Sequence, residues 1–414
     1  MAYALNPKTV IRSGYGIYYM LFERFGSEDQ LALNAPFLIN NVQAVASGAT
    51  APLFFLQDGF PANSLDPNQP GLLSRVRVRA VDPATPTPYV QQWSLGIQRE
   101  LPWNLLGEVN YVGTHSSHLN VLADLNQPFF NPDGSSTGDI PFSNFGYIEY
   151  QRPVGFGKYN GLEATLERRF RQGLSTRFAY TYSRSIDNTP QELESNSGSA
   201  PNGYNYTSWT GPSDFDTPHR VVASYVWELP FGRGRRFVHD GILSHIIGGF
   251  RTSGVYTYAS GRPFTISSGG SIANSLDKFG AVAATPNQVG TPHIVGNVDC
   301  WFFASNDKIG TRTPCLDLAP GLSDAYQLQS AGFLGNVGRN TLRGPHTSVF
   351  DFAFMRDFPI HESLGLQFRW EVFNLANAVL LGQPSTNISS SSVGQITSLS
   401  GDPRVMQFAL RLSF

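Results

Sequence analysis

The sequence predicts an all-β protein, an antiparallel transmembrane β-barrel of about ten meandering strands that forms part of a larger barrel. Ten segments alternate apolar and polar side chains over about 9–12 residues, close to the length that a tilted strand needs to cross hydrocarbon. Short and long connections alternate between these segments. Charged residues are 14% of the chain and aromatic residues 13%, whereas charged residues are about 25% of ordinary soluble domains.

The ten predicted strands, in order, are residues 9–20, 89–100, 105–113, 160–170, 174–186, 219–230, 249–260, 347–358, 363–374 and 404–414. Each places apolar side chains at alternate positions, which is the period of a β-strand. The main apolar positions are Ile11, Tyr15, Ile17 and Tyr19; Trp93, Leu95 and Ile97; Val109 and Tyr111; Leu162, Ala164 and Leu166; Phe178, Tyr180 and Tyr182; Val221, Ala223, Tyr225, Trp227 and Leu229; Phe250, Tyr256 and Tyr258; Phe350, Phe352 and Phe354; Leu364, Leu366, Phe368, Trp370 and Val372; and Met406, Phe408, Leu410, Leu412 and Phe414. An eleventh candidate, residues 75–79, is either an extra strand or part of a loop hairpin.

The connections between the predicted strands differ in length at the two ends of the sheet. Residues 101–104, 171–173 and 359–362 are tight turns with Pro, Gly or Asn, and a moderate Gly/Arg-rich link begins at Phe231. The other connections, 21–88, 114–159, 187–218, 261–346 and 375–403, are long. Long loops argue against a compact soluble domain. They are typical of a transmembrane barrel, with short periplasmic turns and long extracellular loops, and the tenth strand then ends in the periplasm.

A transmembrane barrel turns an apolar face to lipid and a polar face to its lumen. Alternation alone also fits a soluble sandwich, but the Tyr and Trp residues near strand ends and the long consecutive hairpins favour the barrel. Basic clusters near the short turns (Arg168, Arg169 and Arg171; Arg233, Arg235 and Arg236) fit snorkelling side chains or simply solvated turn charges. The candidate lumen-facing residues are Glu163, Glu167, Arg177, Asp351, Arg369, Glu371 and Arg411. Such residues could line a pathway, hold a plug, or only pair across strands.

The last predicted strand carries the sharpest local signal. Phe408, Leu410, Leu412 and Phe414 alternate to the final residue of the chain. This pattern resembles the C-terminal assembly signal that the barrel-assembly machinery reads in bacterial outer-membrane proteins. The alternative is an ordinary edge strand of a soluble protein, although an exposed aromatic-ended edge invites aggregation.

Composition excludes several classes of protein. The net charge is −2, which offers no electrostatic term for nucleic acid. The 41 Gly and 28 Pro argue against a helical bundle. No apolar run of about 18 residues predicts a transmembrane helix, and the first residues do not resemble a signal peptide.

Few residues have the spacing of a chemical site. We find no nucleophile, phosphate-binding or zinc motif and predict no enzyme, catalytic residue, cofactor or metal site. His115 and His118 fit loop histidines better than a metal site. Asp214 and Asp216, ahead of His219, are either a cation site or, more in keeping with their position, a loop corner held by Asp hydrogen bonds. Cys300 and Cys315 are a candidate disulfide or two free thiols.

Five segments resemble recurrent stretches of Oar-like TonB-dependent receptors of acidobacterial type: 87–101, 159–166, 180–185, 214–221 and 371–377. The resemblance implies an outer-membrane receptor barrel for energy-coupled uptake of an unidentified ligand, in contact with outer-membrane lipid and powered by TonB through a plug domain. Full barrels of this type have about 22 strands and a plugged lumen. The sequence shows about ten strands and no plug or signal peptide, so we expect residues 1–414 to be one partial barrel domain. A self-contained small barrel, a passive porin-like or structural barrel, and a soluble secreted β-protein are the alternatives.

Overall fold

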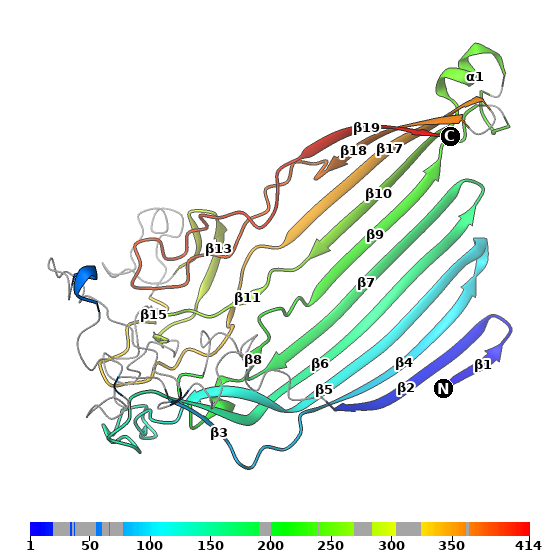
Figure 1. The fold of residues 1–414 in the computed structure, drawn as a ribbon. Coiled ribbons are helices and arrows are strands. Elements are labelled where there is room, and N and C mark those ends of the chain that lie inside the picture. Colours follow the sequence, from blue (N-terminus) through cyan, green and yellow to red (C-terminus); the bar gives the residue numbers. More distant parts are fainter. Residues whose placement is uncertain are drawn as a thin grey trace.

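The structure is a computed structural model. It describes residues 1–19, 34, 37, 55–59, 66, 78–189, 200–232, 234–238, 240–268, 284–303, 324–361 and 364–414. One large, twisted and curved sheet runs through the molecule, and the long loops gather at one end of it (Figure 1). The short turns and the C-terminus lie at the other end.

Eleven strands follow one another across the sheet, each antiparallel to its neighbours. They are β1 (Ala2–Asn6), β2 (Thr9–Tyr19), β4 (Tyr89–Leu101), β5 (Leu105–Asp124), β6 (Ile148–Arg171), β7 (Leu174–Asp187), β9 (His219–Glu228), β10 (Phe250–Ala259), β17 (Thr347–His361), β18 (Leu364–Phe373) and β19 (Val405–Ser413). The ten predicted strands are all present. The sheet is open, because β1 and β19 are its two edges within the described part of the chain.

Three features of the sheet differ from the sequence prediction. The five-residue strand β1 was not predicted. Strands β5 and β6 extend past the predicted limits and pair with each other out to Asp124 and Glu149, with a bulge near Leu119, so half of the predicted loop 114–159 is strand and residues 125–147 remain the loop. The candidate strand 75–79 forms β3 at Val78–Val81, parallel to β6, while residues 75–77 lie outside the described residues.

The register of the strands aligns their apolar positions on a single face. Directly paired residues share a face of a sheet, and Leu162 pairs with Tyr111 on one side and Tyr182 on the other. At the far end of the sheet, Trp370 pairs with Phe354 and Phe408. We call this side the apolar face and the opposite side the polar face. The apolar face is continuous from β2 to β19, and many of its side chains are exposed, with Phe408 70% accessible.

The buried core lies among the loops. Three two-stranded sheets form there: β11 (Pro263–Phe264) with β16 (Leu342–Arg343), β12 (Asn287–Gln288) with β15 (Tyr326–Gln327), and β13 (His293–Asn297) with β14 (Cys300–Phe303). The short strand β8 (Gly211–Pro212) pairs with β7. The largest buried cluster comprises Phe264, Ile266, Phe302, Ala325, Tyr326, Val337, Leu342, Ile388 and Val393. The long loops therefore have tertiary structure of their own, which rests on the end of the sheet.

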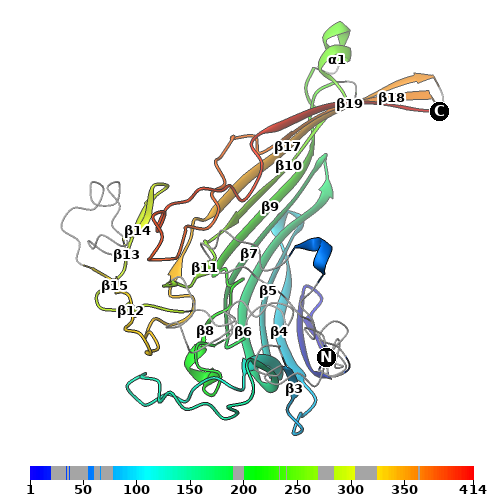
Figure 2. The same ribbon diagram turned by 60° about the vertical axis from the view of Figure 1, so that its left-hand side comes forward.

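Helices are short and lie in the connections. The single-turn 3₁₀ helices are η2 (Leu56–Asp58), η4 (Pro102–Asn104) and η5 (Tyr206–Trp209). The helix α1 (Gly241–Ile247) lies in the connection between β9 and β10 and projects beyond the strand ends (Figure 2). No helix among the described residues is long and apolar enough to cross a membrane.

Candidate functional site

Several charged side chains of the polar face are paired with polar neighbours on that face. In β18, Glu371 accepts hydrogen bonds from Arg369 and from Gln407 Nε2, the latter at 2.7 Å. At the turn end, Asp357 Oδ2 lies 3.0 Å from Arg251 Nη2. Its other oxygen accepts a 2.7 Å hydrogen bond from Gln367. Pairing within β18 and between neighbouring strands thus satisfies these charges on the polar face.

The register places all seven candidate lumen-facing residues on the polar face, in two groups. On β6 and β7, Glu167 and Arg177 are direct cross-strand partners, and Glu163 lies two pairs further along the same face, opposite Thr181. The second group lies on β17, β18 and β19 and comprises Asp351, Arg369, Glu371 and Arg411. Strands β9 and β10 separate the two groups, so they form no single cluster. That this face lines a lumen stays a prediction.

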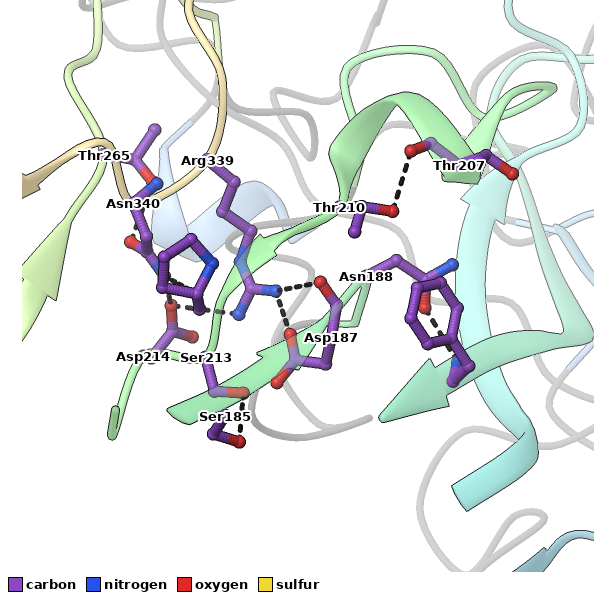
Figure 3. Close-up of polar contacts among 12 residues, drawn as sticks. Ser185, Asp187, Asn188, Thr207, Thr210, Ser213, Asp214, Thr265, Arg339 and Asn340 are labelled. Atoms are coloured by element: carbon purple, nitrogen blue, oxygen red, sulfur yellow. Dashed lines mark hydrogen bonds and ion pairs between the residues drawn. The ribbon is translucent and has the colours of Figure 1, made fainter. Parts of the chain in front are cut away.

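A buried ion-pair network joins the loops to the end of β7. The guanidinium of Arg339, which is 5% exposed, pairs with the carboxylate of Asp187 at the last position of β7. It also lies 3.0 Å from Asp214 Oδ1. Figure 3 shows Arg339 between the two carboxylates. Its neighbour Asn340 donates to Asp214 Oδ1 at 2.6 Å and to Pro212 O at 2.7 Å. Arg339 thus holds together segments that are far apart in the sequence.

The second carboxylate of the 214–219 segment anchors the same corner. Asp216 is 2% exposed. One of its oxygens accepts a 2.6 Å hydrogen bond from the backbone N–H of Ser185, and the other pairs with Arg343. His219 lies apart from this network and shares a 2.9 Å hydrogen bond with Tyr180. The segment is therefore a corner held by Asp hydrogen bonds, and its two carboxylates face arginines.

A second set of buried polar contacts joins residues 125–127 to the 200–204 loop. Tyr204 donates its hydroxyl to Gln127 O at 2.6 Å, and Leu125 O lies at 2.9 Å. Burial, followed by the negative charge of Asp124, raises the pKa of Tyr204 to about 12. The fully buried Gln127 donates to Pro201 O at 2.7 Å and accepts from Gly203 N at 2.8 Å. These contacts give the loop end a fixed shape.

The sequence interpretation missed the arginines of this network. Asp214 and Asp216 stood out, but their partners Arg339 and Arg343 lie more than a hundred positions further along. One usable signal exists, because these two arginines are the only Lys or Arg residues in 324–346. A buried carboxylate such as that of Asp216 requires a cation, and segment 324–346 supplies two.

The remaining candidates lie in different places. His115 lies opposite Lys158, whereas His118 adopts φ 57° and packs its ring 5.5 Å from Tyr89. Cys300 is fully buried in β14. Cys315 lies outside the described residues, so the disulfide stays a prediction. In the C-terminal strand, Phe408 stacks on Trp370 at 6.2 Å, while Leu410, Leu412 and Phe414 are exposed.

An open groove of about 510 Å³ crosses strands β4 to β7. Ile97, Val109, Leu166 and Phe178 line it from the apolar face, and Gly107 leaves space between them. The groove is almost entirely apolar, with Arg99 at its border. It is therefore suited to hydrocarbon and not to a polar solute.

The chain was compared with known proteins. A protein-family model described as an outer membrane beta barrel domain matches residues 1–407. No curated protein matches the chain. Similar solved structures include the outer membrane transporter YddB from Escherichia coli (11% identity, TM-score 0.47, covering 99% of this chain and 39% of that chain). A second is the ferric-catecholate import receptor Fiu from E. coli K12 (10% identity, TM-score 0.42, covering 100% of this chain and 34% of that chain). A third is the FrpB iron transporter from Neisseria meningitidis (10% identity, TM-score 0.40, covering 99% of this chain and 37% of that chain). The chain spans less than two fifths of the length of each.

Proposed function

Because the chain belongs to the outer membrane β-barrel domain family, we propose that it is the C-terminal barrel portion of an Oar-like TonB-dependent receptor. The protein lies in the bacterial outer membrane, with the apolar face toward lipid. The proposed role is energy-coupled uptake of a ligand whose identity stays open. The proposal assigns transport to the chain, and no catalytic step.

The observation that carries this proposal is the open eleven-stranded sheet. In lipid, every backbone N–H and C=O needs a partner, so a spanning sheet must close and leave no edge. Neighbouring strands are antiparallel throughout, hence β1 and β19 run in the same direction. An odd number of further strands is then needed to close an even-numbered antiparallel barrel. Eleven more strands make 22, the size of the transporters with a plugged lumen.

The two ends of the sheet fit the parts of such a receptor. The loop end carries fixed tertiary structure, which suits loops that meet a ligand on a rigid scaffold. In this proposal the loops 114–159, 187–218 and 261–346 form the ligand-facing surface. TonB acts through a plug domain outside this chain. The barrel-assembly machinery reads Phe408, Leu410, Leu412 and Phe414.

The size and behaviour of the native polypeptide test the proposal. An antibody against residues 324–346 is used on outer membranes of the source organism. We expect a heat-modifiable band far above the 45.4 kDa of this chain, and photocrosslinking of that polypeptide to TonB. A heat-modifiable band at 45.4 kDa that makes liposomes permeable without TonB would overturn the proposal in favour of a passive barrel.

A further inference from the structure

The connection between β9 and β10 exposes aliphatic side chains at the short-turn end. It covers residues 229–249 and includes α1. Ile242 is 81% exposed, Leu243 55% and Ile246 57%. The helix contains no acidic residue, and His245 is its only titratable group. Backbone hydrogen bonds close the turn of this connection. The three exposed aliphatic side chains therefore contribute little to its folding.

The helix is attached to the lipid-facing side of the sheet. Arg356 belongs to the apolar face, because it pairs directly with Phe250 and Phe368. Its guanidinium donates to the carbonyls of His245 and of Ile246, the latter at 2.7 Å. It also lies 4.8 Å from the ring centre of Phe250. One arginine thus caps the C-terminus of α1 and holds it beside the face that contacts lipid.

The same connection also carries arginines. Arg236 lies over the ring of Phe237 at 5.3 Å, and Phe237 contacts Phe231 at 6.0 Å between ring centres. Arg235 pairs with Glu228 at 2.7 Å. The arginine turn packs against the helix, because a Cβ on Gly232 would come within 2.5 Å of Gly248 Cα. The turn that carries Arg236 and the helix that carries the exposed aliphatic side chains therefore form one packed unit.

Aliphatic side chains beside arginines are the composition of helices that lie in a membrane interface. The exposed aliphatic side chains continue the lipid-facing surface, and the short-turn end faces the periplasmic leaflet, whose lipids carry phosphate groups. We propose that the described residues of this connection, 229–232, 234–238 and 240–249, form an interfacial anchor of the barrel. Ile242, Leu243 and Ile246 insert among the acyl chains of the periplasmic leaflet, and Arg236 binds a phosphate of an anionic phospholipid, while Arg356 holds α1 in place. The anchor rests on the part of the proposed function that places the short-turn end of the barrel at the periplasmic leaflet, and it is independent of TonB coupling.

Photocrosslinking to lipid tests the anchor in the complete native protein. The photoreactive amino acid benzoylphenylalanine replaces Leu243 in cells, and adducts are identified by mass spectrometry. Leu95, in the middle of the apolar face, is the positive control, and Asp139, exposed at the loop end, is the negative control. We expect phospholipid adducts at positions 243 and 95 and none at 139.

Two outcomes would overturn the proposal: no adduct at 243 while 95 is labelled, or an adduct with a periplasmic protein in place of lipid. Neither outcome depends on measuring uptake, so neither bears on the proposed receptor function.

The role of the positive charge is tested with Arg236→Gln. This substitution should lower the share of phosphatidylglycerol among the adducts at position 243 by about fivefold, as expected for one arginine near a charged surface. Arg404→Gln at the loop end is the matched control and should change nothing. An unchanged share in Arg236→Gln would contradict the phosphate contact.

Discussion

Arg339 and Asp187 form a buried ion pair across 152 positions of the chain. Asp187 is the last residue of β7, and Arg339 belongs to the segment that leads into β17. The pair fastens a long loop to the rim of the sheet, and Asp214 joins it from a third segment. In the proposed receptor, a loop surface held in this way reduces the ordering cost of binding a ligand.

Replacing Arg339 should loosen the loop end locally. Removal of one partner of a buried ion pair leaves an uncompensated charge and costs about 3–5 kcal/mol. In Arg339→Ala we expect proteinase K to cleave segment 324–346 about a hundredfold faster, because about 3 kcal/mol corresponds to roughly that factor in the open population. Arg262→Ala, which removes an exposed arginine of the neighbouring loop, is the control. Equal cleavage of both variants would contradict the role of the pair.

Asp216 and Arg343 should be energetically coupled. Asp216→Asn keeps an acceptor for the N–H of Ser185 but removes the charge that faces Arg343. Residues in direct contact show coupling energies of about 0.5–3 kcal/mol in double-mutant cycles. We expect a coupling energy in this range when the proteinase K cleavage rates of Asp216→Asn, Arg343→Gln and the double variant are compared with that of the wild type. Strictly additive effects would show that the contact contributes nothing.

Adding an arginine should destabilise the protein at one position of β17 and have little effect at the next. Phe352 lies on the apolar face between Gly254 and Val372, whereas Ala353 lies on the polar face opposite Glu371. Arginine on a lipid face costs about 2–4 kcal/mol at the bilayer midplane. Urea unfolding in liposomes should therefore show a loss of this size for Phe352→Arg and little change for Ala353→Arg. The reverse order would mean that the two faces are wrongly assigned.

Tyr204 should make the loop end sensitive to alkali. In the unfolded chain a tyrosine ionises near pH 10, whereas the pKa of Tyr204 is raised to about 12 in the folded protein. The unfolded state then binds fewer protons, so stability is intact below pH 10 and falls as the pH rises to about 12. The difference between the near-ultraviolet titrations of the wild type and Tyr204→Phe should show one tyrosine that ionises near pH 12. A difference centred at pH 10 would refute the shift.

The C-terminal residue should matter for assembly more than for the folded sheet. Phe414 is 95% exposed and lies beyond the last residue of β19, so its removal deletes little packing. If it belongs to an assembly signal, deletion of Phe414 should sharply reduce the heat-modifiable form in outer membranes. Refolding of the purified protein into detergent should be unchanged. Ser413→Ala is the control. Normal assembly of the truncated protein would show that Phe414 is not part of an assembly signal.

The strands and their faces were predictable because a strand's side-chain period is a local property of the backbone. Leu366, Phe368 and Trp370 alternate with Gln367 and Arg369, and this alone assigns the two faces of β18. Elements too short to show a period were missed: β1 has five residues and α1 has seven. The extension of β5 to Asp124 also escaped, since the polar run from Thr114 to Asn120 has no apolar alternation, and only pairing with β6 makes it a strand.

The sequence by itself determined that ten strands alternate with short and long connections, and that each has one apolar and one polar face. It also marked Asp214 and Asp216 as unusual. Only the tertiary structure decided which side chains neutralise these carboxylates, because ion pairs between distant loops leave no periodic trace in a single chain. It also placed α1 beside Arg356. The approach of Gly232 to Gly248 folds the connection onto α1, and the register of β10 on β17, which joins residues about a hundred positions apart, brings Arg356 to it.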